Sequence, residues 1–325
     1  MPPMKPQLAC LTLAMMVTGS LLAATDAGGD PASLPTKRIL VFTKSSGYEH
    51  SVIKDPTKPF KAFPGSAVPG LAFQVLKDLG AKNNIDFVFS KDGSLFAPAY
   101  LAQFDAFFFY TTGDLTEVGT DGNPAMSPQG KEAFLQAIAD GKGFIGTHSA
   151  TDTFHSPGGK EIAGARFLGD GDNAEPYIKM IGAEFIIHGS QQPSHLSVAD
   201  SKFPGAVAVT SGNDLIEEWY TLKDFAKDMH VVLVQETSGM TGPMYARPSY
   251  PSTWARMYGK GRVFYTNMGH RDDVWTSAMF QSVLLGGINW AIGRADADVT
   301  PNIEQVTPQA NVLPAYPYPE ANAKK

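Results

Sequence analysis

The sequence predicts an α/β protein with a doubly wound, mostly parallel β-sheet, helices on both faces and an additional β-hairpin region. Strand-like and helix-like segments alternate over residues 38–148, as in βαβ units. Residues 104–110 are apolar at nearly every position, which is typical of a strand covered on both faces. Residues 253–258 and 262–266 flank Gly259-Lys260-Gly261, and this spacing predicts the hairpin.

The first half of the predicted domain contains the parallel strands. Apolar residues repeat at helical spacing from Leu71 to Leu79, and Gly80 ends this helix. A second helix is expected over residues 127–141. The strands are short apolar runs rich in branched and aromatic side chains. They are expected at residues 38–43, 85–89, 104–110 and 143–147.

The second half contains shorter strands, irregular loops and a closing helix. Before the hairpin, strands are expected at residues 185–187, 195–199 and 230–235. The closing helix is expected over residues 277–292, because its apolar residues fall on one face. Trp254, Trp275 and Trp290 are expected in the core.

Composition excludes several classes of function. The 325 residues carry a formal net charge of −6, with no basic stripe of the kind that a nucleic-acid-binding protein presents. Hydrophobic residues make up 43% and charged residues 18%, so a folded protein with a large core is expected. The one cysteine, Cys10, excludes disulfides within the chain and a multi-thiolate metal site.

The N-terminal segment predicts export. Lys5 precedes an apolar run over residues 8–24 that ends in small residues, as in a signal peptide. An uncleaved anchor is the alternative. We therefore expect a signal peptide at residues 1–24, a linker at 25–37, one domain at 38–293 and a largely disordered, Pro- and Ala-rich tail at 294–325. After cleavage no stable membrane span is expected, and the location would be periplasmic or secreted.

One glycine motif does not predict a nucleotide cofactor. Residues 141–146 match the spacing G-x-G-x-x-G, but these glycines enter a strand. A dinucleotide-binding loop must follow a strand and open a helix, since the helix N-terminus binds the pyrophosphate. No nucleotide cofactor is expected.

Polar residues concentrate at the ends of the predicted strands, where open α/β sheets bind ligands. For each histidine alone, an ordinary strand-capping role is the alternative; their shared placement points to a joint site. His195 and His230 are expected to be structural. The site candidates are His148 and Asp152, His188, the group Glu217-Glu218-Trp219-Tyr220, His270, and Tyr48 with His50 as weaker candidates.

The same histidines suggest a metal. Zinc accepts imidazole nitrogens and carboxylate oxygens, and a catalytic zinc keeps one open position. His148, His188 and His270 are the expected ligands of a zinc-like divalent ion. The alternative is that these histidines act as acids and bases without a metal.

The chain resembles the ThuA-like (trehalose utilisation) proteins, relatives of class I glutamine amidotransferase domains. The resemblance implies a flavodoxin-like, amidotransferase-like fold. In the amidotransferase relatives a cysteine occupies the position of His148, so glutaminase chemistry is not expected here. The stretches that carry the resemblance are residues 38–50, 143–154, 181–189, 218–220, 259–270 and 286–291.

The resemblance implies a role in carbohydrate catabolism. We expect an exported enzyme (a hydrolase, lyase or isomerase) that acts on a disaccharide or keto-glycoside, a small-molecule sugar. A non-enzymatic sugar- or glycan-binding module and a scaffold with a decayed site are the alternatives. Amidotransferase-like domains often pair, so a homodimer is a further expectation. The expected catalytic residues are His148, His270 and Asp152, and the expected substrate-binding residues are Tyr48, His50, His188, Glu218, Trp219 and Tyr220.

Overall fold

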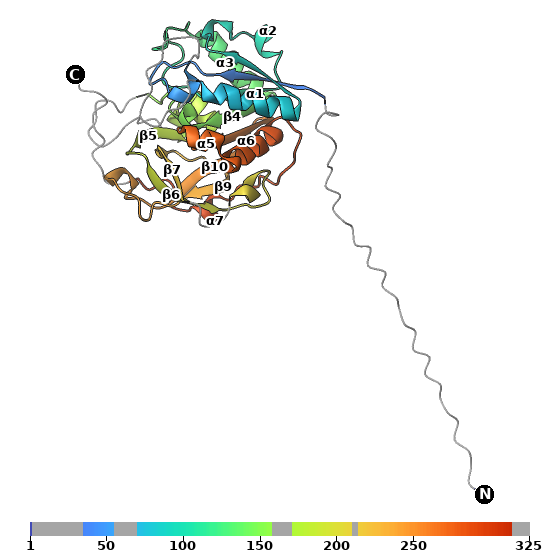
Figure 1. The fold of residues 1–325 in the computed structure, drawn as a ribbon, viewed down its shortest axis with the longest axis vertical. Helices are drawn as coiled ribbons and strands as arrows, with labels where there is room; N and C mark the ends of the chain where they lie inside the picture. The colour runs from blue at the N-terminus through green and yellow to red at the C-terminus, as the bar shows by residue number, and fades with distance from the viewer. Residues whose placement is uncertain (2–34, 55–69, 158–170, 210–213, 314–325) are drawn as a thin grey trace.

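The computed structural model describes residues 1, 35–54, 70–157, 171–209 and 214–313 (Figure 1). The predicted signal peptide, apart from residue 1, and most of the predicted linker lie outside the described residues. Within the described ranges, no helix combines the length and the apolar character that a membrane span requires.

A nine-stranded mixed sheet forms the centre of the molecule, in the order β2-β1-β3-β4-β11-β10-β9-β6-β7. The first five strands in this order are parallel. The sequence predicts this for the first four, whereas the fifth was expected only as a strand of the hairpin. They are β2 (Ile85–Ser90), β1 (Lys37–Phe42), β3 (Ala106–Phe109), β4 (Gly143–Thr147) and β11 (Gly261–Thr266).

The other four strands continue the sheet in antiparallel pairs. The predicted hairpin is confirmed, because β10 and β11 pair with Tyr258 opposite Gly261. These strands are β10 (Tyr250–Tyr258), β9 (His230–Gln235), β6 (Gln192–Val198) and β7 (Asp214–Glu217). A separate two-stranded sheet joins β5 (Glu184–His188) to β8 (Tyr220–Lys223).

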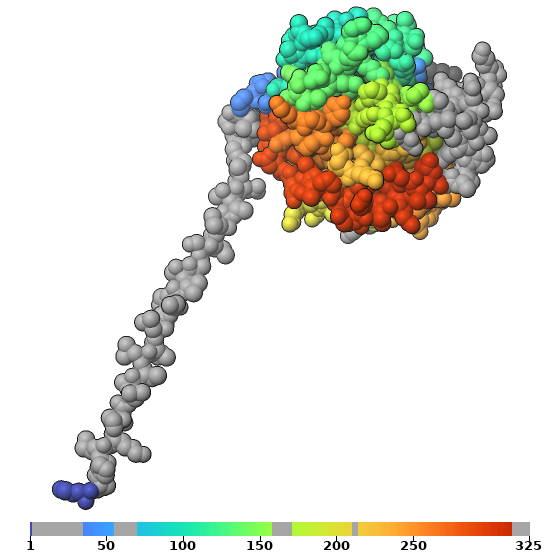
Figure 2. Space-filling model, turned by 180° about the vertical axis from the view of Figure 1, so that it is seen from behind, coloured from blue at the N-terminus to red at the C-terminus, as the bar shows by residue number. Residues whose placement is uncertain are grey.

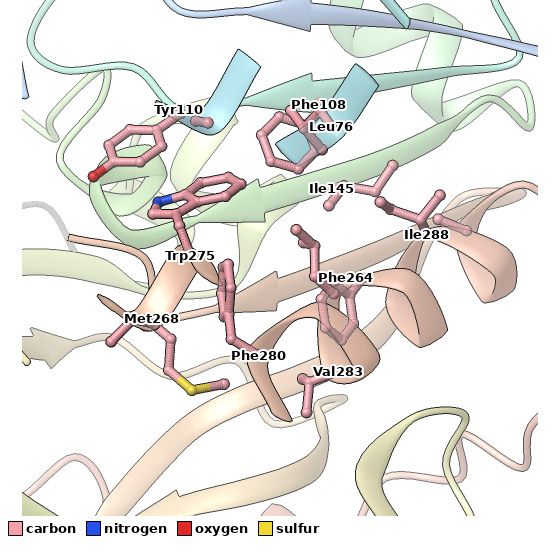
Figure 3. Close-up of a cluster of buried hydrophobic side chains, with 14 of the residues drawn as sticks. Leu76, Phe108, Tyr110, Ile145, Phe264, Met268, Trp275, Phe280, Val283 and Ile288 are labelled. Atoms are coloured by element: carbon pink, nitrogen blue, oxygen red, sulfur yellow. The ribbon is translucent and has the colours of Figure 1, made fainter. Parts of the chain in front are cut away.

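Helices cover both faces of the sheet, and the alternation of side chains in β1 shows why. Ile39 and Val41 belong to one buried apolar cluster, whereas Leu40 and Phe42 belong to the other. The first cluster includes apolar residues of α1 (Leu71–Asn83) and α6 (Ala278–Ala291) and is shown in part in Figure 3. The second includes those of α3 (Pro128–Ala139) and α4 (Pro176–Ile181).

The shorter helices complete the architecture. Trp254, Trp275 and Trp290 are all buried in the core, as predicted. The short helices are α2 (Pro98–Leu101), α5 (Asp272–Thr276) and α7 (Ile303–Val306), together with the 3₁₀ turns Ser51–Ile53 and His148–Thr151.

The C-terminal segment differs from the sequence prediction. Disorder was expected from residue 294, but residues 294–313 are described and pack against the domain. Ile303 and Ala310 are buried, and the Asn302 side chain bonds to both backbone groups of Val231 in β9. Figure 2 shows these red C-terminal residues spread across one face of the molecule. Tertiary contacts, and not helix periodicity, order this segment.

The order of the strands indicates at which edge of the sheet a ligand-binding site is expected. The chain leaves β1 for β2 on one side and returns to β3 on the other, which makes a topological switch point at the carboxyl end of β1. The loops that follow β1, β4 and β11 all start from this edge, since these strands are parallel.

Candidate functional site

Four side chains converge at the carboxyl edge of the parallel strands. One nitrogen or oxygen from each of His50, His148, Glu218 and His270 lies within 4.8 Å of the other three. His50 follows β1, His148 follows β4, His270 follows β11, and Glu218 lies between β7 and β8. We call this group the histidine–glutamate centre. Each member was a candidate from sequence, and folding brings them together.

His148 lies at the middle of this centre in a constrained conformation. It is fully buried and has φ +44°, in the left-handed region that a non-glycine residue rarely adopts. Its Nδ1 lies 3.2 Å from the Asn267 carbonyl oxygen, which can only accept, so Nδ1 carries a proton. Its Nε2 therefore faces the centre, 3.3 Å from His270 Nδ1 and 3.6 Å from Glu218 Oε2.

Glu218 supplies the negative charge of the centre. Its Oε2 lies 3.1 Å from His270 Nδ1, and its Oε1 lies 3.4 Å from His188 Nδ1. Burial alone would raise the pKa of this carboxyl, but the hydrogen bonds and charges of His148 and His270 hold it well below its usual range. Glu218 is therefore ionised at neutral pH.

The neighbouring Glu217 holds the loop that carries His270. This carboxylate is fully buried; its Oε1 accepts from the backbone N–H groups of Gly269 at 2.6 Å and His270 at 2.8 Å. Its Oε2 accepts from the Glu218 N–H at 2.9 Å. Sequence reasoning placed Glu217 in the acidic and aromatic group but gave it no role, because a buried acid that binds only backbone looks the same in sequence as a solvated one.

The backbone at position 269 requires a glycine. Its φ is +122°, and a Cβ there would lie 2.8 Å from Thr147 Oγ1. Its carbonyl accepts from the Tyr110 hydroxyl at 3.0 Å and the Trp275 indole N–H at 2.6 Å. The Tyr110 and Trp275 rings stack on each other with their centroids 6.3 Å apart (Figure 3). The position of His270 is therefore fixed from several sides.

His50 and His270 have opposite proton affinities. Burial, together with the neighbouring histidines, lowers the pKa of His50 well below its usual value, so this ring is neutral. Burial also opposes charge on His270, but the hydrogen bond and charge of Glu218 raise its pKa above the usual value. His50 Nδ1 is buried without a hydrogen-bond partner among the described residues.

Two predicted residues form the solvent-facing side of the centre. Tyr48 is 51% exposed, and its ring lies edge-on to the His50 ring at 5.0 Å. The His188 side chain is 41% exposed and stacks on Tyr220, its partner in the β5–β8 pair. Tyr220 is itself buried, 4.2 Å from the His148 ring, with its hydroxyl 3.5 Å from His50 Nε2.

Two predicted site residues lie apart from the centre. Trp219 is fully buried, and its indole N–H donates to the Gln192 carbonyl, so its ring belongs to the core. Asp152 pairs with His155 Nε2 at 2.7 Å, and His155 Nδ1 lies 3.1 Å from Glu184. The short 3₁₀ turn that begins at His148 places Asp152 in this second charged cluster.

The expected metal-ligand set also differs from the structure. His148 and His270 belong to the centre, but His188 Nδ1 lies against Gly189 O and the outer oxygen of Glu218. His50 and Glu218 take the place that sequence reasoning gave to His188. His195 and His230 lie elsewhere, paired with Asp214 and Asp200.

A separate cavity lies at the opposite edge of the sheet. It is lined by residues of α2 and α3 and by Asp105 and Lys142, which directly precede β3 and β4. Ligands of open α/β sheets bind beyond the carboxyl ends of the strands, and this cavity lies at the amino ends. The histidine–glutamate centre, which lies at the carboxyl ends, is therefore the candidate functional site.

Comparison with known proteins supports the fold. Residues 38–291 match a family model described as ThuA, trehalose utilisation. The crystal structure of a ThuA-like protein from Bacteroides uniformis aligns with a TM-score of 0.57 at 17% identity, covering 80% of this chain and 93% of that one. One from Parabacteroides merdae aligns at 0.48 and 15% identity, covering 82% and 95%. No curated protein matches in sequence.

Proposed function

This chain belongs to the ThuA (trehalose utilisation) family, and on that premise we propose that it is an exported enzyme of carbohydrate catabolism. Its substrate is a disaccharide or a keto-glycoside, and the reaction is a hydrolysis, an elimination or an isomerisation. The N-terminal apolar run supports export to the periplasm or the exterior.

The observation that carries the enzyme proposal is the pairing of a proton donor with a proton acceptor. In the metal-free centre, Glu218 favours a proton on His270, while His148, whose Nδ1 donates to the Asn267 carbonyl, turns the lone pair of Nε2 toward the same point when its ring is neutral. These two nitrogens lie 3.3 Å apart. A sugar hydroxyl, or a carbon beside a ketone, could lose its proton to one and regain one from the other.

The partly exposed residues indicate how a sugar would approach. Tyr48 and His188 lie on the open side, and the Glu218 and His270 side chains are 14% and 16% exposed. A carboxylate and imidazoles bind sugar hydroxyls, and an exposed aromatic ring can pack on the apolar face of a sugar. Cysteine chemistry on glutamine is not proposed, because Cys10 is the only thiol in the chain and lies outside the domain.

A substrate screen tests this proposal. We expect the purified protein to convert trehalose, another disaccharide or a keto derivative of one, with product detected by chromatography and NMR. His270→Ala should lose about 10²- to 10⁴-fold in turnover, the usual contribution of an acid–base group. His195→Ala, which changes a partly exposed histidine outside the centre, should keep full turnover.

Exposed Tyr48 beside polar groups favours a second candidate, a sugar-binding module. This alternative predicts saturable sugar binding without product, and a large loss of affinity in Tyr48→Ala. Trp219→Ala is not a suitable test of it, because Trp219 is buried in the core.

A further inference from the structure

We propose that the histidine–glutamate centre binds one zinc-like divalent metal ion through His148, His270, Glu218 and His50. Nothing in this inference rests on a sugar substrate, since it follows from the geometry of the side chains alone.

Three of the ligand atoms already have the spacing of a metal site. His148 Nε2, His270 Nδ1 and Glu218 Oε2 form a triangle with edges of 3.3, 3.1 and 3.6 Å. A tetrahedral zinc ion with bonds of about 2.0–2.2 Å would separate neighbouring ligand atoms by roughly 3.3–3.6 Å. Two edges fall within that range and the third is slightly shorter. His50 offers a fourth nitrogen within the same 4.8 Å.

The tautomer of His148 adds an independent argument. Because Nδ1 donates to the Asn267 carbonyl, the lone pair of this ring in its neutral form is on Nε2, which faces the centre. This lone pair faces the negative Oε2 of Glu218, an arrangement that a cation between the two atoms would stabilise. Metal-bound histidines typically donate their other ring N–H to a backbone carbonyl, as His148 does.

The surroundings hold the other ligands in place. Glu217 fixes the backbone on both sides of the centre, at Glu218 and at His270. The second oxygen of Glu218 lies against His188, which would orient the carboxylate without binding the ion. The buried Nδ1 of His50 has no hydrogen-bond partner in the described part of the chain, so a metal could use it or its Nε2.

The donor atoms determine which metal fits. Imidazole nitrogens with one carboxylate oxygen suit zinc and its transition-metal neighbours, whereas Mg²⁺ and Ca²⁺ prefer sites made of oxygen. Because the ligands come from four separated loops, binding requires the folded domain and should stabilise it.

The test is zinc binding to chelator-stripped protein without any sugar. Isothermal titration calorimetry and elemental analysis should give one zinc ion per chain, and zinc should raise the Tm while Mg²⁺ and Ca²⁺ leave it unchanged. Glu218→Gln and His270→Ala should each lower zinc affinity by more than about 100-fold, beyond the usual effect of an outer partner. Two substitutions in separate loops protect the test against one variant that fails to fold.

His188→Ala and His195→Ala are the matched controls. His188 touches Glu218 from outside, so its loss should lower zinc affinity at most about 10- to 100-fold. His195 lies in β6, so His195→Ala should leave the zinc affinity unchanged. Failure of the wild type to bind zinc, or equal binding by wild type and folded Glu218→Gln, would overturn the proposal. Sugar turnover that persists after chelation would then preserve the proposed function on acid–base chemistry alone.

Discussion

At the scale of single residues, side chains that are adjacent in sequence lie in different environments. Glu218 reaches the centre, whereas Trp219 enters the core and Glu217 binds backbone N–H groups. The sequence identified the acidic and aromatic cluster, but the direction of each side chain depends on the short connection from β7 to β8. The sequence also did not predict that Asp152 pairs with His155, because this contact depends on the fold.

The Asp152–His155–Glu184 cluster predicts a pH dependence of stability. Burial opposes a charge on His155, but both carboxylates raise the pKa of its imidazole above the usual value. The protonated His155 therefore stabilises the folded protein fully below about pH 6.5, the pKa of histidine in the unfolded chain. This stabilisation is lost as the pH rises through the pKa of His155 in the folded protein. The Nζ of Lys223 also lies near this cluster, 3.5 Å from Glu184 Oε2.

We therefore expect His155→Gln to cost more unfolding free energy at about pH 6 than at about pH 9. Urea denaturation of wild type and variant at both pH values measures this difference. An equal cost at both values, or a greater one at the higher pH, would mean that His155 does not bind a proton more tightly in the folded state.

At the scale of secondary structure, periodicity predicted the main elements. The helices α1, α3 and α6 and the parallel strands lie within a few residues of their expected positions, because each buries a regular apolar face. The extra strands β7 and β8 and the short helix α7 were not predicted. They are too short to show a period, and they form through contacts with distant segments.

The C-terminal segment gives a prediction at this scale. A chain that ends at residue 298 would lose buried Ile303 and the two Asn302 bonds to Val231, while one that ends at residue 313 would keep them. Burying an isoleucine contributes about 1.5–3 kcal/mol, and each hydrogen bond about 0.5–1.5 kcal/mol. We expect the shorter chain to be less stable by at least about 2 kcal/mol in urea denaturation. Equal stability of the two chains would show that residues 299–313 contribute nothing to the fold.

At the scale of the whole molecule, the sheet explains why distant residues form one site. The rule that ligands bind at the carboxyl ends of strands correctly grouped His148 and His270, since both follow parallel strands. It could not predict that His50 is a full member, because the conformation of the loop after β1 is not encoded by a periodic pattern. Glu218 enters from the antiparallel side of the molecule, which no strand-end rule covers.

We propose that sugar chemistry takes place at the histidine–glutamate centre. A crystal structure of the protein with trehalose, or with the substrate found in the screen, tests it most directly. We expect a sugar within hydrogen-bonding distance of Glu218 or His270, bordered by Tyr48 and His188. A sugar bound instead in the cavity beside α2 and α3, at the amino ends of the strands, would contradict it.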